Sequence, residues 1–325
     1  MGGDAARTPC HKRAMAQNDI IVFDRAAVRA HRTRAATQFA AHDFLFREVA
    51  ARLVDRLADI SRTFPVALDL GARNGVIADA LRMDGVAGLR GIATLVEAAP
   101  VRRCARAPLG LVADEEMLPI ALASCDLVLS NLALHWVNDL PGALLQIRQS
   151  LRPDGLFLGA MLGGDTLPEL RASLAEAEMA VEGGLSPRVS PFADVRDLGG
   201  LLQRAGFALP VTDADTIRVT YADAFGLLRD LRGMGETNAV VERRRTPLRR
   251  ATLMRAAEIY QARFAGPDGR IPATFQVVTL TGWAPHESQQ KPLRPGSAKT
   301  RLADALGTTE IAAGDKIAPP PPKRV

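Results

Sequence analysis

The sequence has few of the features that mark secreted, membrane-spanning or metal-binding proteins. Its three cysteines, Cys10, Cys104 and Cys125, lie far apart and form no C-x-x-C pair, which excludes a disulfide framework and a cysteine-rich zinc site. No apolar run is long enough to span a membrane, and residues 1–18 lack the apolar core of a signal peptide. We expect a globular protein of a reducing compartment. We interpret residues 1–18 as a disordered extension, although their basic character also suits an organellar transit peptide.

The five histidines show no metal-binding pattern. No H-x-D or H-x-E motif occurs, and no two histidines lie at helical spacing within the expected sheet segment. An iron site of two histidines and one carboxylate is therefore not visible locally, although His286 and Glu287 could contribute from a distance. We predict no metal site.

Charge of one sign is not concentrated enough to indicate nucleic-acid binding. The formal net charge of +5 comes mostly from arginines that are spread along the whole chain. The densest basic run, residues 242–250 (ERRRTPLRR), lies in a segment that could dock an acidic partner surface. We predict no nucleic-acid partner.

The hydrophobic pattern predicts an α/β fold. Apolar residues recur at helical spacing over residues 44–57, behind Asp43 as a natural N-cap. From Val66 the chain alternates short apolar runs with helix-compatible segments, as expected for a parallel sheet covered by crossover helices. Residues 274–283 are rich in β-branched residues and predict a late strand that returns to the sheet.

The pattern also suggests where the parts of the chain divide. A Rossmann-like domain with an N-terminal helix covers residues 19–162, and residues 163–270 form a helical cap insertion with one strand, after the fifth strand of the sheet. Residues 271–298 supply the late strand and a tail, and the proline-rich residues 299–325 are predicted to be disordered.

The loop LDLGARNGV, residues 68–76, carries the first functional signal. It lacks two of the three glycines that a dinucleotide pyrophosphate needs, because Arg73 and Val76 stand in their places. It retains Asp69, Gly71 and Gly75, which match the loop that cradles the amino-acid carboxylate of S-adenosylmethionine in class I methyltransferases. Arg73 either pairs with that carboxylate or blocks its path.

Polar residues at the ends of the next strands support this cofactor. Glu97 can accept both hydroxyl groups of a ribose, and Asp114 with the backbone N–H of Glu115 can read the amino edge of adenine. Asn131 and His135 follow the fourth strand, where a substrate would meet the cofactor. His135 is a candidate general base, or else a buried histidine that packs beside Trp136.

Six short motifs between about position 22 and position 298 carry a family resemblance. The motifs are ADEE (113–116), LHWVNDLP (134–141), GAM (159–161), GGDTL (163–167), DLRGMGE (230–236) and PATFQ (272–276). With these motifs the chain resembles the mitochondrial complex I assembly factors described as arginine hydroxylases and their α-proteobacterial relatives, and more distantly the malonyl-carrier-protein methyltransferases of biotin synthesis.

The resemblance implies a seven-stranded, mostly parallel class I methyltransferase fold that binds S-adenosylmethionine. It also implies a protein substrate, the complex I subunit that carries the terminal iron–sulfur cluster, modified at an arginine by methylation or hydroxylation. Membrane association would be at most peripheral, through complex I. A carrier-protein or small-molecule carboxylate methyltransferase and a non-catalytic assembly chaperone remain alternatives. We expect a cytoplasmic protein in a bacterium, or one at the matrix or inner-membrane face in a mitochondrion.

Overall fold

The computed structural model describes residues 21–83, 85–106, 108–290 and 300–308. Two compact units are separated at residues 286 and 287, and the first contains the sheet and all of the residues discussed below. The predicted extension, residues 1–18, lies outside the described residues. Most of the predicted disordered tail also lies outside the described residues. Within its described part, residues 302–306 form the short helix α10 (Leu302–Leu306), since leucine and alanine favour helix.

A seven-stranded sheet forms the centre of the first unit, in the order β3-β2-β1-β4-β5-β7-β6. Strands β1 to β5 pair in parallel, and β7 is antiparallel to both of its neighbours. The predicted α/β class and the late returning strand are therefore confirmed. The strands are β1 (Val66–Leu70), β2 (Thr94–Ala99), β3 (Gly110–Val112), β4 (Cys125–Asn131), β5 (Leu151–Leu162), β6 (Ala208–Tyr221) and β7 (Ile271–Trp283).

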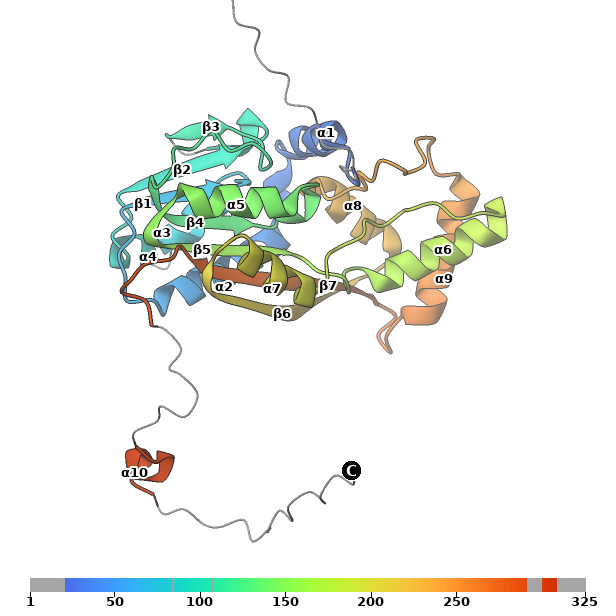
Figure 1. Ribbon diagram of the computed structural model, residues 1–325. Helices are drawn as coiled ribbons and strands as arrows, with labels where there is room; N and C mark the ends of the chain where they lie inside the picture. Colours follow the sequence, from blue (N-terminus) through green and yellow to red (C-terminus); the bar gives the residue numbers. More distant parts are fainter. Residues whose placement is uncertain (1–20, 84, 107, 291–299, 309–325) are drawn as a thin grey trace, which may run out of the picture. The chain divides into compact units, whose positions relative to one another are not determined.

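Helices cover both faces of the sheet because alternate strand residues point to opposite sides (Figure 1). In β1, Ala67 faces one hydrophobic cluster, whereas Leu68 and Leu70 face another. The first cluster includes helices α2 (Phe44–Ala58), α3 (Val76–Met83) and α4 (Val86–Leu89), and the second includes α5 (Leu140–Ser150) and α7 (Val195–Arg204). Asp43 stands at the start of α2 as expected, but its carboxylate accepts a bond from Arg47 instead of capping the helix.

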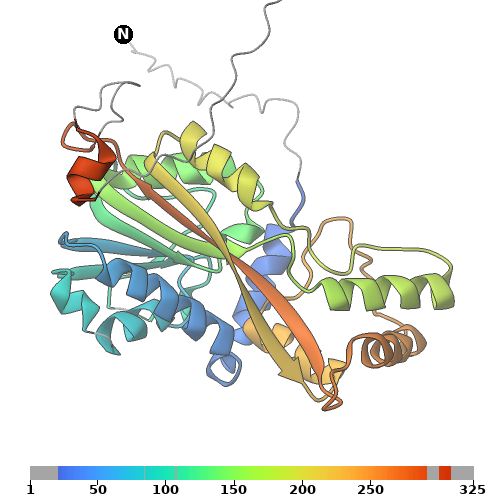
Figure 2. The ribbon, with the colours of Figure 1, turned by 90° about the horizontal axis from the view of Figure 1, so that it is seen from below.

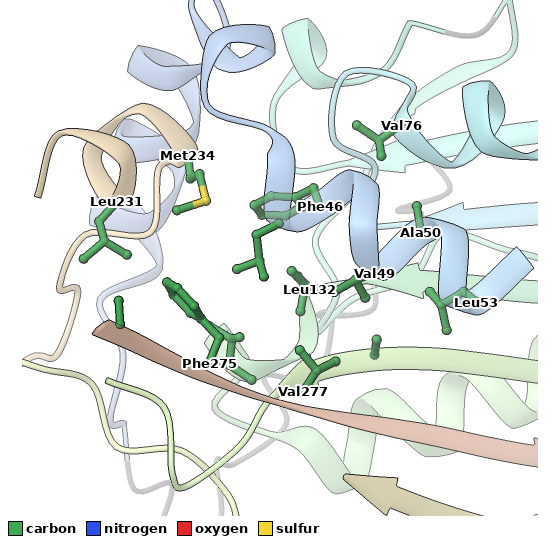
Figure 3. Packing of buried hydrophobic residues seen from close by; sticks show 14 of the residues in the cluster. Phe46, Val49, Ala50, Leu53, Val76, Leu132, Leu231, Met234, Phe275 and Val277 are labelled. Atoms are coloured by element: carbon green, nitrogen blue, oxygen red, sulfur yellow. The ribbon is translucent and has the colours of Figure 1, made fainter. Parts of the chain in front are cut away.

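The segment predicted as a cap contributes three helices beyond the end of the sheet. These are α6 (Pro168–Glu182), α8 (Ala224–Met234) and α9 (Arg250–Phe264). The pairing of β6 with β7 extends further along β7 than the pairing of β5 with β7. Figure 2 shows β6 and β7 running toward these helices. Leu231 and Met234 of α8 join the same cluster as Phe46 of α2 and Phe275 of β7 (Figure 3). The cap and the sheet thus share one core.

Helix α1 (Arg25–Ala35) is held in place by contacts of the residues just before it. Phe23 forms an antiparallel bridge with Val240, after α8, and its ring packs edge-on against Trp136, with centroids 5.4 Å apart. The amide oxygen of Asn138 accepts the backbone N–H groups of Val22 and Phe23. These contacts hold α1 across the carboxyl end of the strands. Among the described residues, no helix combines the length and apolar character needed to cross a bilayer.

Candidate functional site

The loop after β1 has the backbone that its glycines predict. Gly71 and Gly75 have φ angles of 78° and 76°, and Asn74 also has a positive φ, of 51°. A Cβ atom on Gly71 would lie 2.2 Å from the Cβ atom of Ala133, so no larger residue fits. The loop lies at the switch point between β1 and β4, where open α/β sheets bind ligands.

Two acids lie side by side beneath this loop. Asp69 and Glu97 are register partners on β1 and β2, and both are at most 1% exposed. Neither carboxylate oxygen of Asp69 has a hydrogen-bond partner among the described residues. Burial, and secondarily the charge of Glu97, raise the pKa of Asp69 well above its usual value. The Glu97 Oε2 atom accepts the backbone N–H of Arg106, so the predicted ribose anchor is already bound by the chain itself.

The acidic residues after β3 pair with one face of α1. Asp114 accepts bonds from Arg25 and, at 3.4 Å, from Arg29, while Glu115 accepts bonds from Arg25 and Arg32. Burial would raise the pKa of Glu115, but the charges of Arg32 and Arg25 outweigh it and lower the pKa to about 2. The spacing of these arginines puts them on one side of the helix. Sequence reasoning missed them, although that spacing was readable.

Arg73 has a partner that the sequence did not suggest. Its Nη2 atom donates to the Glu236 carboxylate and, at 3.0 Å, to the carbonyl oxygen of Met234, at the end of α8. The guanidinium also lies 4.9 Å from the ring centroid of Phe46 and 5.6 Å from that of Phe39. Arg73 therefore links the loop after β1 to the cap.

Glu236 also forms hydrogen bonds with two residues that follow β4. Its Oε2 atom accepts the indole N–H of Trp136 at 2.7 Å and lies 3.0 Å from Nε2 of His135. Because a carboxylate only accepts, His135 donates through Nε2, and its Nδ1 atom is buried without a partner among the described residues. Burial acts to raise the pKa of Glu236, but the bond from His135 and the charges of His135 and Arg73 lower it to about 2.

Asn131 ends β4 close to this group. Its Nδ2 atom donates to the carbonyl oxygen of Phe46 at 2.9 Å, and its Oδ1 atom is buried without a partner in the described part of the chain. Of the predicted site residues, Gly71 and Glu115 lie near each other, Asp69 and Glu97 are strand neighbours, and Arg73 and His135 meet at Glu236. Glu236 itself was missed as a site residue, although it ends the DLRGMGE motif.

A cavity of about 130 Å³ lies between the cap and the end of the sheet. Its walls are mainly apolar, with leucines of α6 and α8 and Phe275 of β7. Its polar wall contains Glu236, Thr237 and Arg188, and the Thr237 hydroxyl is buried without a partner among the described residues. Arg188 is paired with the buried carboxylate of Glu178. Nowhere in residues 21–290 or 300–308, as far as they are described, do three His, Cys, Asp or Glu side chains form a group that could hold a metal ion.

The strand order, the antiparallel β7 and the glycine loop after β1 define a class I methyltransferase fold. A family model described as "Methyltransferase domain" matches residues 40–210. Arginine-hydroxylase NDUFAF5 is 44% identical over 288 residues in Danio rerio, covering 87% of this chain and 89% of that protein. The Homo sapiens protein of the same name is 45% identical, with shares of 87% and 83%. The chain belongs to the methyltransferase-domain family and, within it, to the family of arginine-hydroxylase NDUFAF5.

A more distant similarity has a different chemistry in its name. The malonyl-[acyl-carrier protein] O-methyltransferase of Xylella fastidiosa is 35% identical over 272 residues, covering 81% of this chain and 89% of that protein. One fold thus serves proteins named for two reactions. The features that the chain shares with both groups identify it as an enzyme of the methyltransferase fold. They do not distinguish between the two reactions.

Proposed function

We propose that this enzyme binds S-adenosylmethionine and hydroxylates an arginine side chain of a protein substrate. In this two-electron oxidation dioxygen would supply the inserted oxygen atom, and an external two-electron reductant would reduce the second oxygen atom to water. Two observations support the reaction: the relatives that align along most of the chain are named arginine-hydroxylases, and the cavity suits an arginine side chain. The sequence resemblance further supports a role in the assembly of respiratory complex I, on the subunit that carries the terminal iron–sulfur cluster. We expect the protein to lie in the cytoplasm of a bacterium, or at the matrix or inner-membrane face of a mitochondrion.

The residues around the loop fit the amino-acid end of S-adenosylmethionine. Gly71 lets the backbone lie close to Ala133, and the unpartnered carboxylate of Asp69 suits an ammonium group. Gly75, Glu97 and Asp114 would lie along the nucleoside, although Glu97 and Asp114 already accept bonds from Arg106 and from α1. When bound, the cofactor supplies an activated methyl group on a sulfonium.

The cavity is the single observation that carries the substrate proposal. An arginine side chain has an apolar stem and a planar cation, and the cavity has apolar walls and a polar end. At that end Thr237 supplies a hydroxyl oxygen that has no partner among the described residues. The Glu236 carboxylate also lines this end, where it already accepts bonds from Arg73, His135 and Trp136. We propose that the stem lies against the leucines and that the guanidinium faces Glu236 and Thr237.

His135 stays the proposed catalytic residue. Its Nε2 atom is fixed by Glu236, which leaves Nδ1 to accept a proton when the ring is neutral. The His135 side chain is fully buried, and its ring centroid lies 5.9 Å from that of Phe192, which lines the cavity. The histidine thus lies beside the proposed substrate cavity and shares Glu236 with Arg73 of the loop.

A carboxylate methyltransferase is the second candidate. The kinship with malonyl-carrier-protein methyltransferases supports it, and so does Arg188, a cation in the wall of the cavity. Against it, the Arg188 cation is already paired with Glu178 and is not available to bind a carboxylate substrate. A non-catalytic assembly chaperone is the third candidate. One experiment distinguishes the three candidate functions.

The experiment is deletion of the gene followed by mass measurement of peptides from the cluster-bearing subunit. Loss of one oxygen mass on an arginine supports the proposal, and loss of a methylene mass shows methylation instead. Unchanged peptide masses with failed complex I assembly favour the chaperone. Normal assembly with a requirement for biotin favours the carrier-protein methyltransferase.

A cavity-filling variant tests the substrate site itself. Ser190 is 5% exposed and lines the cavity, so Ser190→Phe should reduce the hydroxylated fraction to about a tenth or less by displacing the substrate side chain. The matched control is Ala180→Phe, on the exposed side of α6, which should restore full modification in the deletion strain. Full modification by a stably folded Ser190→Phe protein contradicts the assignment of the cavity.

A further inference from the structure

Polar atoms without a partner among the described residues gather around the loop after β1. The hydrogen-bond donors are Nε and Nη2 of Arg32 and Nε of Arg73. The acceptors are both oxygens of Asp69 and Oδ1 of Asn131. All of these residues are at most 3% exposed. Buried polar atoms without partners are rare in folded proteins because each costs free energy, so a group of them indicates a missing ligand.

The donors reach the loop through Glu115. The Glu115 Oε1 atom lies 3.3 Å from the position that a Cβ atom on Gly71 would take, and it accepts a bond of 2.6 Å from Nη1 of Arg32. The Nη2 and Nε atoms, which together form another edge of the Arg32 guanidinium, have no partner among the described residues. Helix α1 therefore places a buried cation directly beside the loop that holds the cofactor in our proposal.

The arrangement of charge matches an amino acid in its zwitterionic form. A carboxylate needs two donors in a fork, which a guanidinium provides, and an ammonium group needs oxygen acceptors. Asp69 lies beside Glu97, and no cation among the described residues bonds to Asp69, so an ammonium group would relieve the repulsion between the two acids. The donors come from α1 and from the loop after β1, and the acceptors come from β1 and β4.

We propose that Arg32 binds the carboxylate of the methionine part of S-adenosylmethionine, with Nε of Arg73 beside it, while Asp69 and Asn131 accept the ammonium group. This inference rests on the proposed cofactor. It makes α1 part of the cofactor site, held there by Arg25 on Glu115 and by the bridge between Phe23 and Val240. Arg32 then acts as a specificity residue for ligands that carry an amino-acid carboxylate.

The test compares two ligands on the full chain by titration calorimetry. S-adenosylmethionine has the carboxylate, and decarboxylated S-adenosylmethionine lacks it but keeps the ammonium group. We expect the wild type to bind the first about 30- to 100-fold more tightly, as is usual for a buried charge-assisted contact. Arg32→Gln should remove this difference by weakening only the first ligand. The control Arg34→Gln, an exposed position on the same helix, should keep it.

The outcomes separate the inference from the proposed function. If the wild type binds both ligands equally, the cofactor stands and the role of Arg32 is wrong. If Arg32→Gln weakens both ligands equally, Arg32 only supports the fold, and the inference also fails. If the wild type binds neither ligand, the proposed cofactor is wrong and the role of Arg32 falls with it. If Arg32→Gln does not fold, equal binding of the two ligands by the wild type still overturns the inference.

Discussion

Two pairs of buried acids lie at the same end of the sheet and have opposite surroundings. Asp69 and Glu97 lie next to each other on parallel strands, and the pKa of Asp69 is raised by burial and by its neighbour. Glu115 is buried just as deeply and the Glu236 side chain is 5% exposed, but each is paired with arginine, and the pKa of each is lowered to about 2. Among the described residues Asp69 has no bonded partner and is left for a ligand to neutralise, whereas Glu115 and Glu236 are already paired with arginines of the chain.

The difference shows which contacts hold the fold and which prepare the site. The bonds from Arg25 and Arg32 to Glu115 and from Arg73 to Glu236 join α1, the loop and the cap. Removing one partner of such a pair leaves the other charge buried and alone. In the unsubstituted protein, the Asp69 carboxylate is already buried without a bonded partner among the described residues. Its presence therefore costs stability, as is common for residues kept for function.

Loss of a paired acid should have the largest effect on stability. Glu115→Gln leaves Arg25 and Arg32 buried with a neutral partner, and we expect a loss of about 3–5 kcal/mol in the free energy of unfolding, measured with urea. The wild-type contribution is present above pH 4.5 and is lost as the pH falls toward 2, because the folded-state pKa is the lower one. The gap between the two proteins should therefore narrow in acid.

The control for this variant is Glu258→Gln, which removes an exposed partner of Arg255 within α9. It should change the free energy of unfolding by at most about 0.5 kcal/mol. Equal losses for the two variants would show that the buried pair is no more important than an exposed one.

Loss of the unpaired acid should have a smaller effect of the opposite sign. Asp69→Asn removes a buried charge with no bonded partner among the described residues, so the protein should gain about 1 kcal/mol at neutral pH while its affinity for S-adenosylmethionine falls. The gain should disappear as the pH falls below 3.8, because Asp69 is then protonated in both the folded and the unfolded chain. Urea unfolding across pH and calorimetry check the two effects. A loss of stability at neutral pH would show that the carboxylate is satisfied in the folded protein.

The smallest effect is expected at the ion pair between α2 and the edge strand. Arg56 and Asp213 bond at 2.6 Å, but their side chains are 35% and 40% exposed. Arg56→Gln should change the free energy of unfolding by at most about 0.5 kcal/mol, because water screens the pair. A change as large as that for Glu115→Gln would remove the contrast between buried and exposed pairs.

The sequence predicted the parts of the site that depend on neighbours along the chain. Asp69, Gly71 and Gly75 lie within one loop, and their backbone geometry follows from residue type and spacing. The strand pattern predicted the parallel sheet, and parallel pairing then brings Asp69 beside Glu97. It also suggested Asp114 and His135 as site residues, because each follows a strand end.

The sequence did not reveal the partners of these residues. Arg73 is separated from Glu236 by 163 positions, and Arg32 from Glu115 by 83. Such pairs depend on how α1 and the cap lie over the sheet, and no local pattern contains that information.

The sequence by itself determined the fold class, the loop and the candidate acids, because backbone preferences and hydrophobic alternation act over a few residues. Only the tertiary structure decided which acids are neutralised and which are left for a ligand. The charge state of a buried carboxylate depends on cations within a few ångströms in space, and here those cations come from a helix and a loop that are distant in sequence from Glu115 and Glu236.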